Sequence, residues 1–206
     1  MHCSSEPSKV CVSEPCREVR SVTAMAASQD RKWIAVAEAT AGTRAPQVSI
    51  LDVEHGLERT GVLLRGPSAD RYNNVAFSAD GMLLVACSQL SDDQTSIFHV
   101  WEWQISSEPS SSGTVSGKAV KATINPKFPA NVVVQSQNDL AYLRLGSSGY
   151  RLHPLNGLKK QVNDKVEFVD HAWLADGELV VALSNRRLLI MEGVEVSKFN
   201  EPVLSC

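Results

Sequence analysis

VDHAWLADGELVVALSNRRLLIMEG, residues 169–193, alternates three short apolar runs with two polar turns. Residues 75–88, VAFSADGMLLVACS, repeat its first half, with the same Asp-Gly turn between a short and a longer apolar run. A third copy, MAASQDRKWIAVAE, covers 25–38, and a weaker fourth, ATINPKFPANVVVQS, covers 122–136 with prolines in place of the Asp-Gly turn. The copies begin about 50 residues apart, a spacing in the range of β-propeller blades.

Each copy has the same order of strand and turn signals. A short apolar segment precedes a turn in which Asp accepts backbone hydrogen bonds and Gly tolerates a positive φ. A longer apolar segment, a polar loop and a third apolar segment follow, with almost no helical periodicity. A fourth, outer segment is clear only after the first copy, at 58–66. Stacked units of three to four short antiparallel strands predict an all-β chain that forms a partial β-propeller of about four blades.

The repeat also sets the expected boundaries. Residues 1–18 are polar and are expected to form a flexible N-terminal segment, and 19–206 to form the partial propeller, with blades near 19–66, 72–117, 118–158 and 159–206. Strands are expected near 22–26, 33–38, 47–53, 74–77, 82–88, 96–103, 121–124, 131–135, 140–145, 169–173, 178–183 and 187–192.

The longer apolar run of each copy carries the expected core. Runs such as LLVAC and LVVAL are apolar on both faces, as in strands that are covered on both sides. One blade cannot cover its own faces, so neighbouring blades must cover each other. We therefore expect Phe77, Leu84, Trp173 and Val180 to be almost fully buried between blades. All four tryptophans fall on strands of the repeat, where packing is the expected role.

Composition argues against several classes of function. The chain has 206 residues, 43% of them hydrophobic, and a net charge of −3, so it lacks the basic surface that nucleic-acid binding usually needs. No apolar run approaches the ~18 residues of a membrane span, and the N-terminus does not resemble a signal peptide. We expect an intracellular protein with neither nucleic acid nor membrane as its partner. The five cysteines are scattered and do not predict a disulfide framework.

Three motifs could carry chemistry, and each is better explained without it. Residues 113–119, GTVSGKA, are one residue short of a phosphate-binding loop and lack its final Ser or Thr, so we interpret them as a solvated insertion. Asp170, His171 and Ser184 lack the nucleophile elbow of a hydrolase, and His171 aligns with Val75 of the repeat. The His and Cys residues of 1–18 lack the spacing of a zinc site. We expect no enzymatic activity, catalytic residue, metal or cofactor.

Three stretches resemble a known family of cilia- and flagella-associated WD-repeat proteins, which carry tandem propellers and a coiled-coil tail. They are WIAVAEATAGTRAPQVSILDV at 33–53, VAFSADGMLLVACSQLSDDQTSIFHVWEW at 75–103 and DHAWLADGELVVALSNRRLLIMEG at 170–193. The resemblance covers roughly residues 20–195 and corresponds to part of the family's amino-terminal propeller. It implies a WD-repeat-like fold and a non-enzymatic scaffold of the axoneme that helps to position or regulate inner dynein arms.

The resemblance further implies a location in the cytoplasm, on the cytoskeleton and in the axoneme of a cilium or flagellum. The implied partners are other axonemal proteins, such as inner dynein arm subunits, related WD-repeat proteins or tubulin. Two adjacent basic pairs, Lys159-Lys160 and Arg186-Arg187, are the candidate contacts to an acidic partner. The alternative is a cytosolic microtubule-associated or peptide-binding propeller module that acts outside cilia.

Four blades in an open arc leave one sheet face uncovered at each end. Large uncovered apolar faces mark interfaces or aggregation sites. We therefore expect the arc to be completed by further blades, from residues absent here or from a neighbouring chain. The segments 22–53 and 169–192 should each face another protein surface.

Overall fold

The computed structural model describes residues 19–40, 46–90, 94–136, 139–147, 149–153, 158 and 166–200. These residues form sixteen strands in four antiparallel sheets of four, and the strands of each sheet follow chain order. Sheet 1 contains β1 (Val19–Ala27), β2 (Trp33–Thr40), β3 (Gln47–Asp52) and β4 (Glu58–Arg65). Sheet 2 contains β5 (Arg71–Phe77), β6 (Leu84–Gln89), β7 (Thr95–Trp101) and β8 (Ser111–Ser116). Sheet 3 contains β9 (Ala119–Ile124), β10 (Asn131–Ser136), β11 (Leu140–Gly146) and β12 (Gly149–His153). Sheet 4 contains β13 (Phe168–Trp173), β14 (Leu179–Leu183), β15 (Leu188–Glu192) and β16 (Glu195–Asn200).

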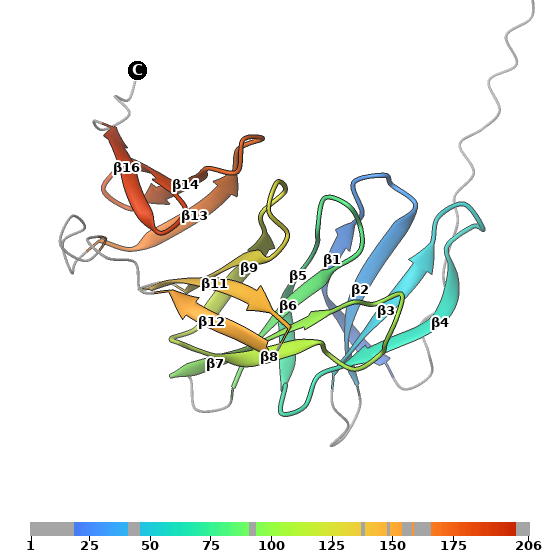
Figure 1. Ribbon diagram of the computed structural model, residues 1–206. Helices are drawn as coiled ribbons and strands as arrows, with labels where there is room; N and C mark the ends of the chain where they lie inside the picture. The colour runs from blue at the N-terminus through green and yellow to red at the C-terminus, as the bar shows by residue number, and fades with distance from the viewer. Residues whose placement is uncertain are drawn as a thin grey trace, which may run out of the picture.

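The four sheets follow one another around an open arc. Figure 1 shows sheet 1 at one end of the arc and sheet 4 at the other. β1 lies beside β5, and β5 lies beside β9, so the first strand of a sheet is its innermost strand and the fourth is its outermost. Each sheet between the two ends therefore has a neighbour on both of its faces.

The predicted all-β class is confirmed, and each of the twelve expected strands has a counterpart. The outer strands β8, β12 and β16 were not expected. The interpretation of 113–119 as a solvated insertion is wrong for both of its ends, because residues 113–116 belong to β8 and Ala119 begins β9 and is buried. In β8 only Ser111 and Val115 are buried, so this outermost strand lacks the apolar run that marks the inner strands.

The turns between the first two strands of sheets 1 and 2 share one hydrogen-bond pattern. In sheet 2, Asp80 accepts hydrogen bonds from the Ser78 hydroxyl and from the Met82 backbone N–H, and Gly81 has a φ of 73°. In sheet 1, Asp30 does the same for Ser28 and Lys32. The predicted role of Asp in these turns is therefore confirmed.

The core consists of three clusters, one between each pair of neighbouring sheets. The first joins Ala35, Ala37 and Ile50 of sheet 1 to residues of sheet 2 that include Leu84 and Trp101. The second lies between sheets 2 and 3, and the third between sheets 3 and 4. Burial between sheets is thus the main source of stability, as expected for units that cannot cover their own faces.

The four residues expected to be almost fully buried divide into two groups. Leu84 is fully buried, as predicted. The prediction is wrong for Phe77, Trp173 and Val180, which are only half-buried. Phe77 ends β5 and packs its ring edge-on against Trp103 at a centroid distance of 6.1 Å. Val180 lies in sheet 4, and no other sheet of the described residues covers its face.

Gly66 allows an unusually close approach of the chain to the cluster between sheets 1 and 2. A Cβ atom at Gly66 would overlap the imidazole ring of His99 and lie 2.5 Å from the Tyr72 hydroxyl oxygen. Both side chains are fully buried and cannot move aside. We expect Gly66→Ala to lower the free energy of unfolding by about 2–3 kcal/mol, through overpacking.

Urea unfolding followed by tryptophan fluorescence measures this loss. Gly146→Ala is the matched control, because the nearest atom to a Cβ there is the Gly149 carbonyl oxygen at 3.9 Å. It should change the free energy of unfolding by less than about 1 kcal/mol. Equal losses in the two variants would contradict the close packing around Gly66.

Candidate interaction surfaces

Each joint between two sheets pairs two different faces. We call the face toward the preceding sheet the leading face, and the face toward the following sheet the trailing face. In the joint between sheets 2 and 3, Val85 and Cys87 of the trailing face pack with Val132 and Val134 of the leading face. The strand registers place the leading and trailing positions identically in all four sheets. The exposure of one position can therefore be compared from sheet to sheet.

The trailing face of sheet 4 is uncovered among the described residues. Its four central side chains, Val180, Ala182, Leu188 and Ile190, are half-buried. The residues at the same positions of the other sheets are all less than 5% exposed: Ala35, Ala37, Val48 and Ile50 in sheet 1, Val85, Cys87, Phe98 and Val100 in sheet 2, and Val133, Gln135, Leu140 and Tyr142 in sheet 3. The trailing face of sheet 4 thus has the residue pattern of a buried face, but no other described sheet packs against it.

The leading face of sheet 1 is uncovered along its innermost strand. Val22 is 58% exposed and Met25 is 68% exposed. The equivalent positions are at most 8% exposed in the other sheets: Tyr72 and Val75 in sheet 2, Ala119 and Ala122 in sheet 3, and Phe168 and His171 in sheet 4. Two large apolar side chains therefore extend from β1 where a preceding sheet would lie.

The central strands of the same leading face are buried. Val36 and Leu51 are less than 9% exposed. The carboxylate of Glu38, 1% exposed, accepts hydrogen bonds from Gln47 Nε2 at 3.0 Å and from Ser49 Oγ at 2.5 Å. Both of these donors belong to sheet 1 itself.

A chain of hydrogen bonds holds the joint between sheets 3 and 4. Gln135 Nε2 donates to the Phe168 carbonyl oxygen, so the Gln135 Oε1 atom faces His171 Nδ1, at 2.6 Å. Since an amide oxygen only accepts, His171 Nδ1 carries the proton and His171 Nε2 accepts from the Thr123 hydroxyl at 2.7 Å. The Thr123 oxygen in turn accepts from Trp173 Nε1 at 2.9 Å.

This network requires a neutral imidazole. The pKa of His171 is lowered to about 4, mainly by burial and also by nearby Lys121, against the opposing charge of Asp170. Lys121 Nζ bridges the joint by donating to Asp170 Oδ1 at 2.6 Å and to the His171 carbonyl oxygen at 2.7 Å. The prediction that His171 is structural rather than a catalytic base is in accord with these contacts.

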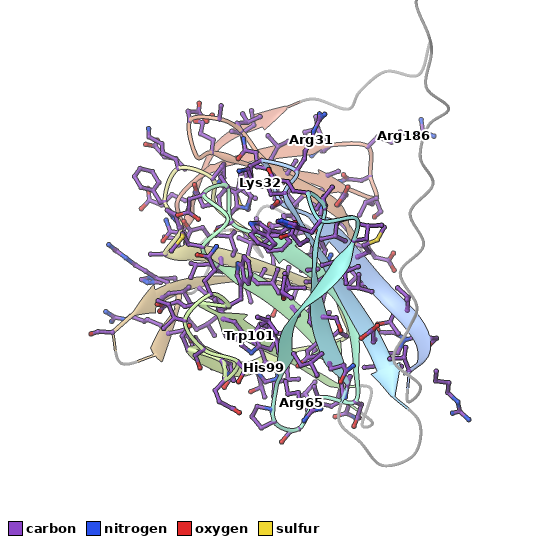
Figure 2. The ribbon with its side chains drawn as sticks, turned by 90° about the vertical axis from the view of Figure 1, so that its right-hand side faces the viewer. Arg31, Lys32, Arg65, His99, Trp101 and Arg186 are labelled. Atoms are coloured by element: carbon purple, nitrogen blue, oxygen red, sulfur yellow. The ribbon has the colours of Figure 1, made fainter. Side chains whose placement is uncertain are left out.

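Aromatic and histidine rings fill the joint between sheets 1 and 2. His99 and Trp101 of β7 are fully buried, with ring centroids 5.5 Å apart, and Figure 2 shows them side by side within the packed side chains. Tyr72 packs edge-on against both rings. Burial lowers the pKa of His99 to about 4 against an opposing effect of the Pro67 backbone, although neither ring nitrogen makes a hydrogen bond of good geometry to a described group.

The structure describes two of the four basic residues that are candidate partner contacts. Arg186 and Arg187 lie in the turn between β14 and β15, and both are exposed. Arg186 has a φ of 66° and projects outward at the rim of the molecule in Figure 2. Lys159 and Lys160 lie outside the described residues.

The described residues offer two further findings on sites. Their His, Cys, Asp and Glu side chains form no group of three that could hold a metal ion. Within the same part of the chain, no helix is both long enough and apolar enough to cross a membrane. The sequence analysis did not single out Val22 or Met25, although their alignment with buried repeat positions could have identified them.

Comparison with known proteins places the fold. No family model matches the sequence, and no curated protein matches it. The chain is similar to the β-propeller domain of Cps50 (Swd1) from Myceliophteria thermophila, with a TM-score of 0.68 and 16% identity over 92% of this chain and 58% of that one. The chain has a β-propeller fold. It is also similar to hydrazine synthase of Kuenenia stuttgartiensis, with a TM-score of 0.61 and 16% identity over 82% of this chain and 52% of that one.

These similarities confirm the predicted fold class, with each sheet of the chain as one blade. The chain spans a little over half the length of the two chains that it resembles. At 16% identity the likeness concerns the fold and does not extend to activity or partners.

Proposed function

We propose that this chain is a non-enzymatic protein-interaction scaffold of the ciliary or flagellar axoneme, where it helps to position or regulate inner dynein arms. The observation that carries the interaction role is the pair of uncovered faces. Val180, Leu188 and Ile190 at one end of the arc, and Val22 and Met25 at the other, occupy positions that are buried in every other sheet. Contiguous exposed apolar faces of this kind favour protein partners.

The axonemal role is supported by the sequence resemblance. The three stretches that resemble the cilia- and flagella-associated family lie on β2–β3, β5–β7 and β13–β15. The resemblance thus includes strands of the core and the trailing face of sheet 4, but not β1, which carries Val22 and Met25. Arg186 and Arg187 are candidate contacts to an acidic surface such as a tubulin tail, because both side chains are exposed.

Detergent extraction of ciliated or flagellated cells that express the tagged chain tests this proposal. We expect the chain to remain with the axoneme after the membrane has been dissolved. Val180→Lys should reduce this retention, because it places a charge on the trailing face of sheet 4. Leu152→Lys is the control, since Leu152 is 54% exposed on β12, outside both uncovered faces, and it should be retained like the unmodified chain.

A diffuse cytosolic distribution of the unmodified chain, with full release by detergent, would argue against the axonemal role. That outcome would favour a cytosolic microtubule-associated or peptide-binding module instead. Sedimentation with purified microtubules would then separate these two readings.

A further inference from the structure

We propose that a groove between β4 and the connection from β7 to β8 binds a short peptide segment of a protein partner, one that carries a large apolar side chain beside a lysine or an arginine. The groove lies on the joint between sheets 1 and 2, and not on either of the uncovered faces. The inference therefore depends neither on what covers the two ends of the arc nor on the axonemal role.

The connection from β7 to β8 departs from the repeat. It spans residues 102–110, whereas the same connection spans 53–57 in sheet 1 and 193–194 in sheet 4. Figure 1 shows it extending from sheet 2 toward β3 and β4 of sheet 1. The additional residues are not needed to join two strands of a blade, and loops of this kind on a rigid scaffold often carry binding residues.

Apolar side chains from both sheets line the groove, which has a volume of about 350 Å³. Val62 and Leu63 line it from β4, and Trp103 and Ile105 line it from the connection. Ile105 is 74% exposed, the largest exposed fraction among the large hydrophobic side chains that the structure describes. An apolar side chain of a partner in the groove would remove this surface from water.

Hydrogen bonds and ring packing hold the connection in place around Ile105. The backbone N–H of Ile105 donates to the Glu102 carbonyl oxygen at 2.8 Å. Trp103 is 4% exposed, donates from Nε1 to the Gly81 carbonyl oxygen at 2.8 Å, and packs edge-on against Trp33 at a ring-centroid distance of 5.3 Å. A fixed segment thus presents the exposed Ile105, so binding would cost little conformational entropy.

Two carboxylates favour a basic residue in the partner. Glu102 and Glu108 stand at the two ends of the lining segment 103–107, and both are exposed. No ion pair joins either carboxylate to another described residue. Arg65 is the last residue of β4 and lies beyond Leu63, on the opposite wall of the groove. A lysine or arginine beside the partner's apolar side chain would therefore meet Glu102 or Glu108 on the wall that the connection forms.

Selection of a phage-displayed library of random short peptides on the immobilised full chain tests the proposal. We expect the enriched peptides to share a large apolar residue beside a lysine or an arginine. Fluorescence anisotropy of one labelled enriched peptide then measures its affinity for each variant. Ile105→Ser should weaken binding about tenfold or more, because it removes the apolar contact. Leu152→Ser, which truncates an exposed apolar side chain of β12, should leave the affinity unchanged.

A charge swap tests the role of the carboxylates separately. The double variant Glu102→Lys, Glu108→Lys should lose the peptide, and it should bind a peptide in which glutamate replaces the basic residue. Added salt should weaken both complexes, because the exposed charges are screened. Every exchanged side chain is exposed, so the variants should fold, and far-ultraviolet circular dichroism checks this.

Three outcomes would overturn the proposal. If no peptide is enriched on the unmodified chain relative to Ile105→Ser, the groove does not bind such segments. Equal affinity of the unmodified and Ile105→Ser chains would place the peptide elsewhere on the molecule. An acidic consensus, or a charge swap without effect, would contradict the assigned chemistry of the partner. Because the assay uses the purified chain, its outcome is independent of where the chain lies in a cell.

Discussion

Trp101→Ala should lower the free energy of unfolding by about 3–5 kcal/mol. Trp101 is fully buried in the joint between sheets 1 and 2, where it packs against Tyr72 at a ring-centroid distance of 5.9 Å and against His99 at 5.5 Å. Both neighbours are themselves fully buried, so they cannot close the cavity that truncation leaves. The loss combines the transfer of a large apolar side chain with the cost of that cavity.

Trp173→Ala is the matched comparison. Trp173 occupies a strand of sheet 4, is only half-buried and donates one hydrogen bond, to Thr123 Oγ1. Sequence analysis predicted the same burial for Trp173 as for Leu84. Because Trp173 is only half-buried, Trp173→Ala should lower the free energy of unfolding clearly less than Trp101→Ala does. Urea unfolding at neutral pH measures both. Two results would contradict the burial of Trp101 in the joint between sheets 1 and 2. One is a larger loss of unfolding free energy for Trp173→Ala, and the other is a loss under about 1 kcal/mol for Trp101→Ala.

Acidification should destabilise the fold between about pH 6.5 and pH 4. Burial lowers the pKa of His99 and of His171 from 6.5 to about 4 in the folded chain. Between these values the unfolded chain binds protons that the folded chain does not, so the free energy of unfolding falls as the pH falls. The loss is on the order of 3 kcal/mol for each histidine once the pH reaches about 4. Two such losses are large against a typical total of about 5–15 kcal/mol.

The physical reason differs between the two sites. At His171, protonation of Nε2 would turn it from an acceptor into a donor, so the Thr123 hydroxyl would lose the acceptor for its own proton. At His99, the charge would appear in a buried site, where the Pro67 backbone offsets only part of the cost of burial. Both joints should therefore weaken. Hydrogen bonds from Ser28 and His55 lower the pKa values of Asp30 and Asp52, so these carboxylates reduce the stability of the fold only at lower pH.

Urea midpoints measured at intervals from pH 7.5 to pH 4.5 test this expectation. The double variant His99→Gln, His171→Gln should show a distinctly flatter dependence on pH, whatever its stability at neutral pH. An unchanged slope in the double variant would mean that other groups are responsible for the acid sensitivity.

The inner strands were predictable because they carry apolar runs at a fixed spacing. The outer strands β8 and β12 were not, since their side chains are mostly exposed and polar, as in SSGTVS of β8. Local sequence also could not distinguish Val85 from Val180, which occupy the same position of the same motif. Val85 is fully buried and Val180 is not, because burial depends on whether another sheet follows.

The hydrogen-bond network between sheets 3 and 4 was also beyond sequence analysis. It joins Thr123, Gln135 and His171 from three strands, and their contact follows only from the packing of two sheets. One signal was present: Gln135 interrupts the apolar run NVVVQS at the position that Ala37 and Cys87 occupy in the other sheets. A polar residue at a buried repeat position indicates a buried hydrogen-bond partner on the facing sheet.

The central claim is that the trailing face of sheet 4, with Val180, Leu188 and Ile190, is a protein-interaction surface. Detergent extraction of ciliated or flagellated cells that express Val180→Lys, Leu152→Lys or the unmodified chain tests it most directly. The account predicts that Val180→Lys is released, while Leu152→Lys and the unmodified chain remain with the axoneme. Equal retention of all three chains would contradict it.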